Sequence, residues 1–117
     1  MDSEKLIELS VNALDNKKAE DISVLKVEKL TSLASYFIIS TATSNTHVRA
    51  LADEVTEKLK ENGIEINHLE GKSTGWLVLD YGDVIINIFT QKERDFYGLD
   101  RMWSDAEIID TENYIKG

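Results

Sequence analysis

Residues 73–90, STGWLVLDYGDVIINIFT, contain two apolar runs that are separated by a single acidic segment, DYGD. Each run has the length of a β-strand, and glycine readily takes the positive φ that tight hairpin turns need. We therefore predict a hairpin whose two central turn residues are Tyr81 and Gly82. This turn pairs Asp80 with Asp83, Val78 with Ile85 and Trp76 with Asn87 across the two strands. A longer turn stays open, because tyrosine is a poor first turn residue.

The predicted hairpin has two chemically different faces. One face is wholly aliphatic and should lie on the core; it consists of Leu77, Leu79, Val84, Ile86 and Ile88. The other face mixes large apolar groups with polar and acidic ones; it consists of Trp76, Val78, Asp80, Asp83, Ile85, Asn87 and Phe89. Either a helix covers this mixed face and the aspartates emerge near the turn, or the face is an exposed apolar patch of the kind that marks binding surfaces.

Helices and strands flank the hairpin on both sides. The expected elements before it are a helix over 3–17, strands within 21–30 and 35–43, a helix that begins after Ser44 or Asn45 and ends near Gly63, a strand at 64–70 and a loop at 71–75. After the hairpin, Phe96, Leu99 and Trp103 have helical spacing, with Gly98 as a weak point, so Phe96 and Trp103 are expected in the core. The tail from 108 to 117 either adds a short edge segment or is mobile.

This order of elements predicts an α/β fold. The chain of 117 residues suits a single layered domain over 1–117, with a mixed β-sheet of about five strands that is flanked by helices. No repeat, proline or linker indicates a second domain. The first twenty residues show no signal or transit peptide, and no apolar run approaches the roughly 20 residues that span a bilayer. We therefore expect a cytoplasmic protein without membrane contact.

Charge and composition narrow the classes of partner. The net charge is −9, and residues 93–112 hold seven acidic side chains against Arg94 and Arg101. This field repels a phosphate backbone, so we expect little direct contact with nucleic acid. An acidic surface suits a basic protein partner, although net negative charge also keeps a small protein soluble. The chain has no cysteine, which excludes disulfides and thiolate metal sites.

Asp80 and Asp83 are the candidates for a metal site of the kind used in nucleotidyl transfer. That chemistry usually needs carboxylates at i and i+2 of one strand and a Gly-Ser phosphate loop, whereas here the spacing is three across a turn. His47 and His68 lie on different predicted elements without ligand spacing, and no serine has the context of a nucleophile elbow. We predict no catalytic residue, no metal, no cofactor and no small-molecule substrate.

Four separated segments carry a family resemblance. They are TSLASYFIISTATSNTHVRALADEV at 31–55, EG at 70–71, GWLVLDYGDVIINIF at 75–89 and ERDFYGLDRMWSDAE at 93–107. Over residues 21–107 the chain resembles the ribosomal silencing factor family, also called RsfS or Iojap. It departs from the family pattern at Ser35, Ala42 and Asn87, where the family usually has an acidic residue, glycine and histidine.

The resemblance implies a non-catalytic factor of the bacterial large ribosomal subunit, with relatives in mitochondria and chloroplasts. Such factors bind the fourteenth protein of the large subunit (L-fourteen) and obstruct joining of the small subunit when nutrients are short. The resemblance also implies a nucleotidyltransferase-like fold without the catalytic motif, and a homodimer when free. Two alternatives stay open: a factor that shields the immature large subunit during its assembly, and a metal-dependent nucleotide-handling enzyme.

The same resemblance places Trp76, Tyr81 and Asn87 on the partner-binding surface. Their predicted neighbours on the mixed face are Val78, Asp80, Asp83, Ile85 and Phe89. Trp76 would be the apolar anchor, because burial of about 150 to 250 Å² of aromatic surface makes at most about 4 to 6 kcal/mol available. The aspartates would meet lysines or arginines of a basic ribosomal protein. Arg94 and Tyr97 contact either the partner or a second protomer, and the sequence leaves this choice open.

Overall fold

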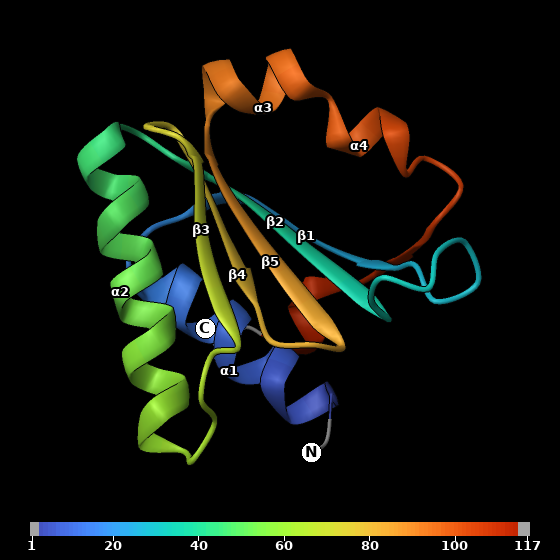
Figure 1. The fold of residues 1–117 in the computed structure, drawn as a ribbon, viewed down its shortest axis with the longest axis horizontal. Coiled ribbons are helices and arrows are strands. Elements are labelled where there is room, and N and C mark those ends of the chain that lie inside the picture. Colours follow the sequence, from blue (N-terminus) through green and yellow to red (C-terminus); the bar gives the residue numbers. More distant parts are fainter. Residues whose placement is uncertain (1–2, 115–117) are drawn as a thin grey trace.

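The computed structural model describes residues 3–114, and these form a six-stranded sheet with helices packed on it (Figure 1). The strands are β1 (Glu20–Lys26), β2 (Tyr36–Ala42), β3 (His68–Ser73), β4 (Trp76–Asp80), β5 (Val84–Thr90) and β6 (Glu107–Ile109). The helices are α1 (Ser3–Asn16), α2 (Asn45–Glu61), α3 (Gln91–Tyr97) and α4 (Leu99–Met102), followed by the 3-10 turn η1 (Thr111–Asn113). No helix among these residues has the length and apolar character that crossing a membrane requires.

The sheet is mixed, and its strand order is β3-β4-β5-β2-β1-β6. β2 and β5 are parallel neighbours at its centre, and the other neighbouring pairs are antiparallel. The predicted α/β class with a mixed sheet flanked by helices is confirmed. Six strands replace the expected five or so, because residues 107–109 of the tail pair with β1.

α2 forms where the sequence predicts it, because its two ends and its apolar stripe are determined by residues of the helix itself and its immediate neighbours. The Ser44 side chain accepts a hydrogen bond from the backbone N–H of His47 at 3.0 Å, which caps the first turn. Beyond the last turn, Gly63 takes a positive φ of 78°, a conformation that glycine adopts without strain. Between these ends, one stripe of the helix is buried; it consists of Val48, Leu51, Ala52, Val55 and Leu59.

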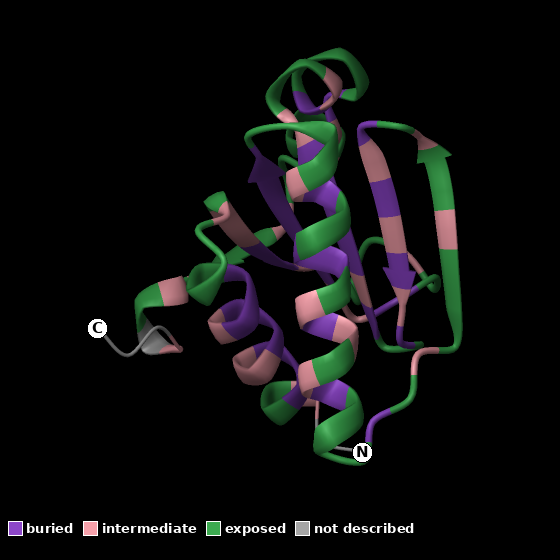
Figure 2. Ribbon diagram, turned by 90° about the vertical axis from the view of Figure 1, so that its left-hand side faces the viewer, coloured by how far each residue is buried: buried purple, intermediate pink, exposed green. Residues whose placement is uncertain are grey.

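Helices cover both faces of the sheet (Figure 1). α1 and α2 pack on one face, where they bury the aliphatic side of the β4–β5 hairpin, as the sequence predicts. Figure 2 shows buried, half-buried and exposed residues interspersed along α2. On the opposite face, α3, α4 and the following loop enclose a smaller core around Phe37, Ile39 and Phe89, and Trp103 lies edge-on to Phe37 at 5.1 Å.

The predicted register of the β4–β5 hairpin is wrong by two residues. Trp76 pairs with Phe89, not with Asn87. The backbone N–H of Tyr81 bonds to the carbonyl oxygen of Val84, which makes Gly82 and Asp83 the central turn residues; pairing across the hairpin continues as Val78 with Asn87 and Asp80 with Ile85. Gly82 has a φ of 87° and occupies the first central position, where hairpin turns require a positive φ. Because a shift of two preserves the strand period, both predicted faces keep their members.

The expectation that Phe96 lies in the core is also wrong, whereas Trp103 packs against the smaller core as expected. The helix that was predicted through both residues is broken at Gly98, which has a left-handed φ of 61°. The break changes the direction of the chain between α3 and α4. Helical spacing across it therefore no longer places Phe96 and Leu99 on one face, and Phe96 points to solvent.

The ends of the sheet differ in detail from the prediction. The strand expected at 64–70 lies at His68–Ser73, because Gly71 and Ser73 pair with β4 instead of forming a loop. Part of the tail predicted as an edge segment or a mobile end is ordered as β6 and η1. Residues 115–117 of that tail lie outside the described residues.

Candidate functional site

Three aromatic side chains gather where β4 meets α3, and we call Trp76, Phe96 and Tyr97 the aromatic cluster. The ring centroids of Trp76 and Tyr97 are 4.5 Å apart, and Phe96 lies edge-on to Tyr97 at 5.0 Å. Beneath them, the fully buried ring of Phe89 stacks on Trp76 at 4.8 Å. Phe96 is 76% exposed and Tyr97 is 38% exposed. The cluster is therefore an exposed aromatic surface that rests on a buried ring.

The indole of Trp76 is held in place by Asn87. Its Nε1–H donates a hydrogen bond to Oδ1 of Asn87 at 3.1 Å. Asn87 is only 4% exposed, so its amide is part of the interior. Because Trp76 is itself half-buried against Phe89 and Tyr97, a partner can cover only the remaining part of the ring.

The two aspartates of the turn have different surroundings. Oδ1 of Asp80 accepts a hydrogen bond from the backbone N–H of Gly82 at 2.8 Å, so this carboxylate stabilises the turn. The side chain of Asp83 is exposed, while its carbonyl oxygen accepts bonds from the N–H groups of Ser35 and Tyr36. Asp83 is thus the more accessible of the two carboxylates.

The neighbouring sheet edge carries a charge pattern that is largely balanced. Glu70 lies beside Val78 on β4, and His68 lies beside Asp80. Glu70 forms an ion pair with Lys72, and this hydrogen bond and the lysine charge lower the pKa of the Glu70 carboxyl. The strand edge next to the hairpin therefore adds little uncompensated negative charge to the acidic turn.

A depression lies between the start of α2 and the β3–β4 turn, on the α2 side of the sheet. It has a volume of about 540 Å³ and is lined by Asn45, Thr46, Val48, Arg49, Gly71, Ser73, Thr74 and Leu77. This lining contains no carboxylate that could hold a metal ion. Within residues 3–114, no three His, Asp or Glu side chains come together as a possible metal site.

The structure divides the predicted site residues into two groups. Six have exposed or half-exposed side chains: Trp76, Val78, Asp80, Asp83, Ile85 and Tyr97. Four are buried: Tyr81, Asn87, Phe89 and Arg94. Phe89 and Asn87 lie beneath Trp76, Arg94 is enclosed by groups of its own chain, and Tyr81 packs on the opposite face of the sheet; partner contact by the ten residues stays a prediction. Sequence reasoning did not place Phe96 on the exposed surface. The available signal was Gly98, because a glycine two residues later can end the helix and so break the helical spacing between Phe96 and Leu99.

The side chain of Tyr81 anchors the hairpin turn in the interior of the protein. Its hydroxyl is buried and makes no hydrogen bond in the described structure. Burial disfavours the charged form and raises the pKa of Tyr81 to about 12, with a smaller contribution from the charge of Glu65. The ring belongs to the larger core on the side of α1 and α2, which is the face of the sheet opposite to the aromatic cluster.

The sequence model of the family described as "Ribosomal silencing factor during starvation" matches residues 1–116. The chain belongs to the ribosomal silencing factor family. A ribosomal silencing factor RsfS from Halalkalibacterium halodurans is 37% identical over 116 residues, which cover 98% of this chain and 99% of that protein. The resemblance drawn from the sequence is confirmed, and the match extends beyond residues 21–107.

Two further comparisons bear on this member of the silencing factor family. A crystal structure of a protein from Chromobacterium violaceum superposes with a TM-score of 0.85 at 38% identity, covering 89% of this chain and 88% of that one. A mouse relative named "Mitochondrial assembly of ribosomal large subunit protein 1" is 28% identical over 102 residues, covering 84% of this chain and 45% of that protein. The fold is thus shared with a solved structure, and one relative has a name that refers to mitochondria.

Proposed function

We propose that the chain binds the large ribosomal subunit through its fourteenth protein and sterically blocks association with the small subunit, which represses translation under nutrient limitation. The observation that carries this proposal is the aromatic cluster, at the end of the β4–β5 hairpin opposite to its acidic turn, on a member of the ribosomal silencing factor family. In this proposal the protein acts in the cytoplasm as a binding module, with no catalytic step and no cofactor.

The chemistry of the surface suits a basic ribosomal protein. Interfaces usually depend on a few aromatic or arginine anchors, and Trp76, Phe96 and Tyr97 supply three aromatic rings in contact. Asp83 at the turn and the net charge of −9 favour encounter with lysines and arginines. The same charge disfavours direct contact with ribosomal RNA.

Binding to purified large subunits, measured by co-sedimentation, tests the proposal. Trp76→Ala should weaken binding by about 2 kcal/mol, roughly 30-fold, because it removes the largest ring of the cluster. Leu69→Ala is the matched control, since Leu69 is a half-exposed apolar residue of the neighbouring strand that pairs with Leu79 on the opposite face. Circular dichroism checks that both variants keep the fold. Equal binding by both variants would remove the aromatic cluster from the mechanism.

Steric blocking requires its own measurement. Wild-type protein added in excess to separated subunits should reduce the fraction of assembled ribosomes in a sucrose gradient. Trp76→Ala should restore that fraction at the same concentration. Binding to the large subunit without any effect on assembled ribosomes would leave the protein as a ligand of the subunit and would contradict silencing.

A second candidate function is assembly of the large subunit. The name of the mouse relative, which refers to assembly of the ribosomal large subunit, favours it. Both functions would use the same surface, so the distinction needs cells that lack the protein. Accumulation of large-subunit precursors during growth would indicate assembly, whereas a defect confined to starvation, with normal precursors, would indicate silencing.

The resemblance also implies a homodimer when the protein is free, and we include it in the proposal. Light scattering at micromolar concentration measures the mass directly. A monomer of 13.2 kDa under these conditions would contradict the dimer without affecting the proposed binding of the large subunit.

A further inference from the structure

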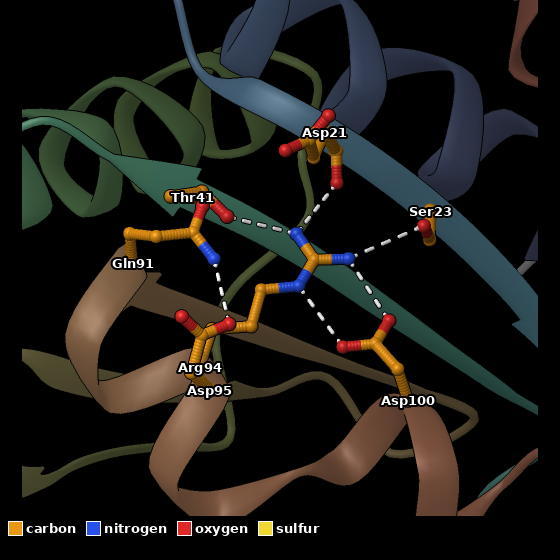
Figure 3. Close-up of polar contacts among 7 residues, drawn as sticks. All are labelled: Asp21, Ser23, Thr41, Gln91, Arg94, Asp95 and Asp100. Atoms are coloured by element: carbon orange, nitrogen blue, oxygen red, sulfur yellow. Dashed lines mark hydrogen bonds and ion pairs between the residues drawn. The ribbon is translucent and has the colours of Figure 1, made fainter.

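Arg94 is a buried cation whose guanidinium joins four segments of the chain (Figure 3). Nη1 donates to the carbonyl oxygen of Asp21 at 2.7 Å and to Oγ1 of Thr41 at 2.9 Å. Nη2 lies 3.4 Å from Oγ of Ser23, and the opposite edge of the guanidinium faces Asp100. The side chain therefore fastens α3 to β1, to β2 and to α4 at the same time.

The contact with Asp100 is bidentate. Nε donates to Oδ2 at 3.0 Å and Nη2 donates to Oδ1 at 2.9 Å. Arg94 lies in α3 and Asp100 in α4, so these two bonds cross the left-handed break at Gly98. Since a planar guanidinium and a planar carboxylate fit in one relative orientation, the pair defines how α4 leaves α3.

The contact with Asp21 depends on an irregularity of β1. The register of β1 against β2 shifts between Glu20 and Ser23, and Asp21 has a φ of 47°, in the left-handed region. This bulge presents the Asp21 carbonyl oxygen to the guanidinium instead of to a strand neighbour. The bulge and Arg94 are thus complementary, although they lie 73 residues apart in the sequence.

Because the Arg94 side chain points inward, helix geometry fixes the directions of Phe96 and Tyr97 on α3. Residues two positions apart on a helix lie on nearly opposite sides, so Phe96 points outward when Arg94 points inward. Tyr97 follows at i+3 and lies on the Arg94 side, where its ring meets Trp76. The directions of the exposed ring and of the ring that contacts Trp76 are thus related to the inward direction of Arg94 by helix geometry.

We propose that Arg94 is a positioning residue of the partner-binding surface: its bonds to Asp100 and to the β1 bulge hold α3 so that Phe96 and Tyr97 extend the surface of Trp76. This inference rests on the proposed function, because its expected consequence is tighter binding to the large subunit. It replaces direct contact of Arg94 with the ribosomal partner or a second protomer, because the guanidinium is already enclosed by groups of its own chain.

Three variants of the full chain test the proposal. Arg94→Met removes the hydrogen bonds, Arg94→Lys keeps the charge but loses the bidentate geometry, and Asp100→Asn weakens only the bond across the helix break. Arg101→Met is the matched control, since Arg101 is an exposed residue of α4 and its loss changes the net charge equally. Asp100→Asn also keeps the test decisive where Arg94→Met does not fold.

Two readouts separate positioning from general stability. Amide hydrogen exchange follows α3 and α4 against α2 and β5, and the resonance of the Trp76 indole N–H reports the aromatic cluster. We expect exchange in residues 91–103 to accelerate at least about tenfold in the Arg94 variants, with α2 and β5 unchanged and the indole resonance shifted. Affinity for large subunits should fall by about tenfold or more in Arg94→Met and Arg94→Lys alike, less in Asp100→Asn, and less than about twofold in Arg101→Met.

The outcomes are distinct. Unchanged exchange in Arg94→Met would show that Arg94 does not hold α3, and faster exchange with unchanged affinity would show that the clamp serves stability alone. Wild-type affinity in Arg94→Lys would indicate a requirement for charge and not for geometry, which also overturns the proposal. Failure of the wild-type protein to bind large subunits would contradict the proposed function, and exchange and the indole resonance would then decide alone whether Arg94 positions α3.

Discussion

The indole Nε1–H of Trp76 and Oδ1 of Asn87 are joined by a hydrogen bond of 3.1 Å across the β4–β5 pair. The two residues are not register partners, since Trp76 pairs with Phe89 and Asn87 with Val78. The bond is therefore diagonal, between positions whose side chains on the same face are within reach of an aromatic ring. It connects the exposed cluster to the buried layer beneath it.

We expect Asn87→Leu to destabilise the protein by about 1 to 2 kcal/mol. Leucine has a similar size but offers no acceptor, so the half-buried indole N–H loses its partner. Urea unfolding measures the loss, and a shift of the Trp76 indole resonance shows that the ring has moved. Asn87→His is the informative companion, because an imidazole nitrogen can accept the same bond. An unchanged indole resonance in Asn87→Leu would show that the hydrogen bond does not orient the ring.

Tyr81→Phe should leave the stability near neutral pH unchanged or slightly higher. The hydroxyl is buried without a hydrogen bond, and removing an unsatisfied polar group relieves its desolvation cost. The variant should also bind large subunits as the wild type does, since the hydroxyl lies below the surface. A clear loss of affinity with an intact fold would return Tyr81 to the list of direct contacts.

Alkaline pH gives a second measurement on Tyr81. Burial raises its pKa from 10.0 to about 12, so between these values the unfolded chain releases the phenolic proton while the folded chain keeps it. The stability contribution of the buried neutral phenol is complete below pH 10.0 and is lost as the pH rises toward about 12. The wild type should therefore lose more stability than Tyr81→Phe across this window. Parallel unfolding curves for the two proteins would contradict the raised pKa.

Acid pH tests the Arg94–Asp100 pair. The hydrogen bond from Arg94, followed by its charge, lowers the pKa of the Asp100 carboxyl below 3.8. The pair therefore stabilises the fold fully above that value, and its contribution is lost as the pH falls through the lowered pKa of the folded state. Asp100→Asn should be less stable than the wild type near neutral pH, and the difference should shrink in acid. A difference that stays constant down to the acid transition would contradict the ionised pair.

Local signals in the sequence predict much of the fold. The cap at Ser44, the stripe of α2 and the alternation of β4 depend on neighbours in the chain, and they appear as expected. The hairpin register was within reach of the same reasoning. Gly82 belongs at the first central turn position, where a positive φ is required, and that rule gives the observed pairing.

Other features depend on groups that are distant in sequence. The mixed face of the hairpin is buried at Phe89 and Asn87 but open at Val78, because α3 and α4 cover only part of it. Their path follows from the left-handed turn at Gly98 and from the bonds of Arg94 to Asp21, Ser23 and Thr41, which lie 53 to 73 residues earlier in the chain. Periodicity carries no information about such contacts.

Gly75→Ala should displace the start of α3. A Cβ atom at residue 75 would lie 2.8 Å from Cγ of Glu93 and 2.8 Å from Oγ1 of Thr90, which is the N-cap of α3. Glu93 also accepts a hydrogen bond from Ser73 at 2.9 Å, so its side chain is not free to move away. We expect a loss of about 1 to 3 kcal/mol in urea unfolding, and faster hydrogen exchange in α3.

Gly71→Ala is the matched control for this substitution, because a Cβ atom there meets only Cδ2 of Leu77 at 3.4 Å. Gly71 lies in β3, and alanine restricts the unfolded chain more than glycine does. The Gly71→Ala variant should therefore be as stable as the wild type or more stable. Because Gly75 supports the helix that carries Phe96 and Tyr97, Gly75→Ala should also weaken binding to large subunits. Equal unfolding and equal binding in the two alanine variants would show that close packing at Gly75 does not position α3.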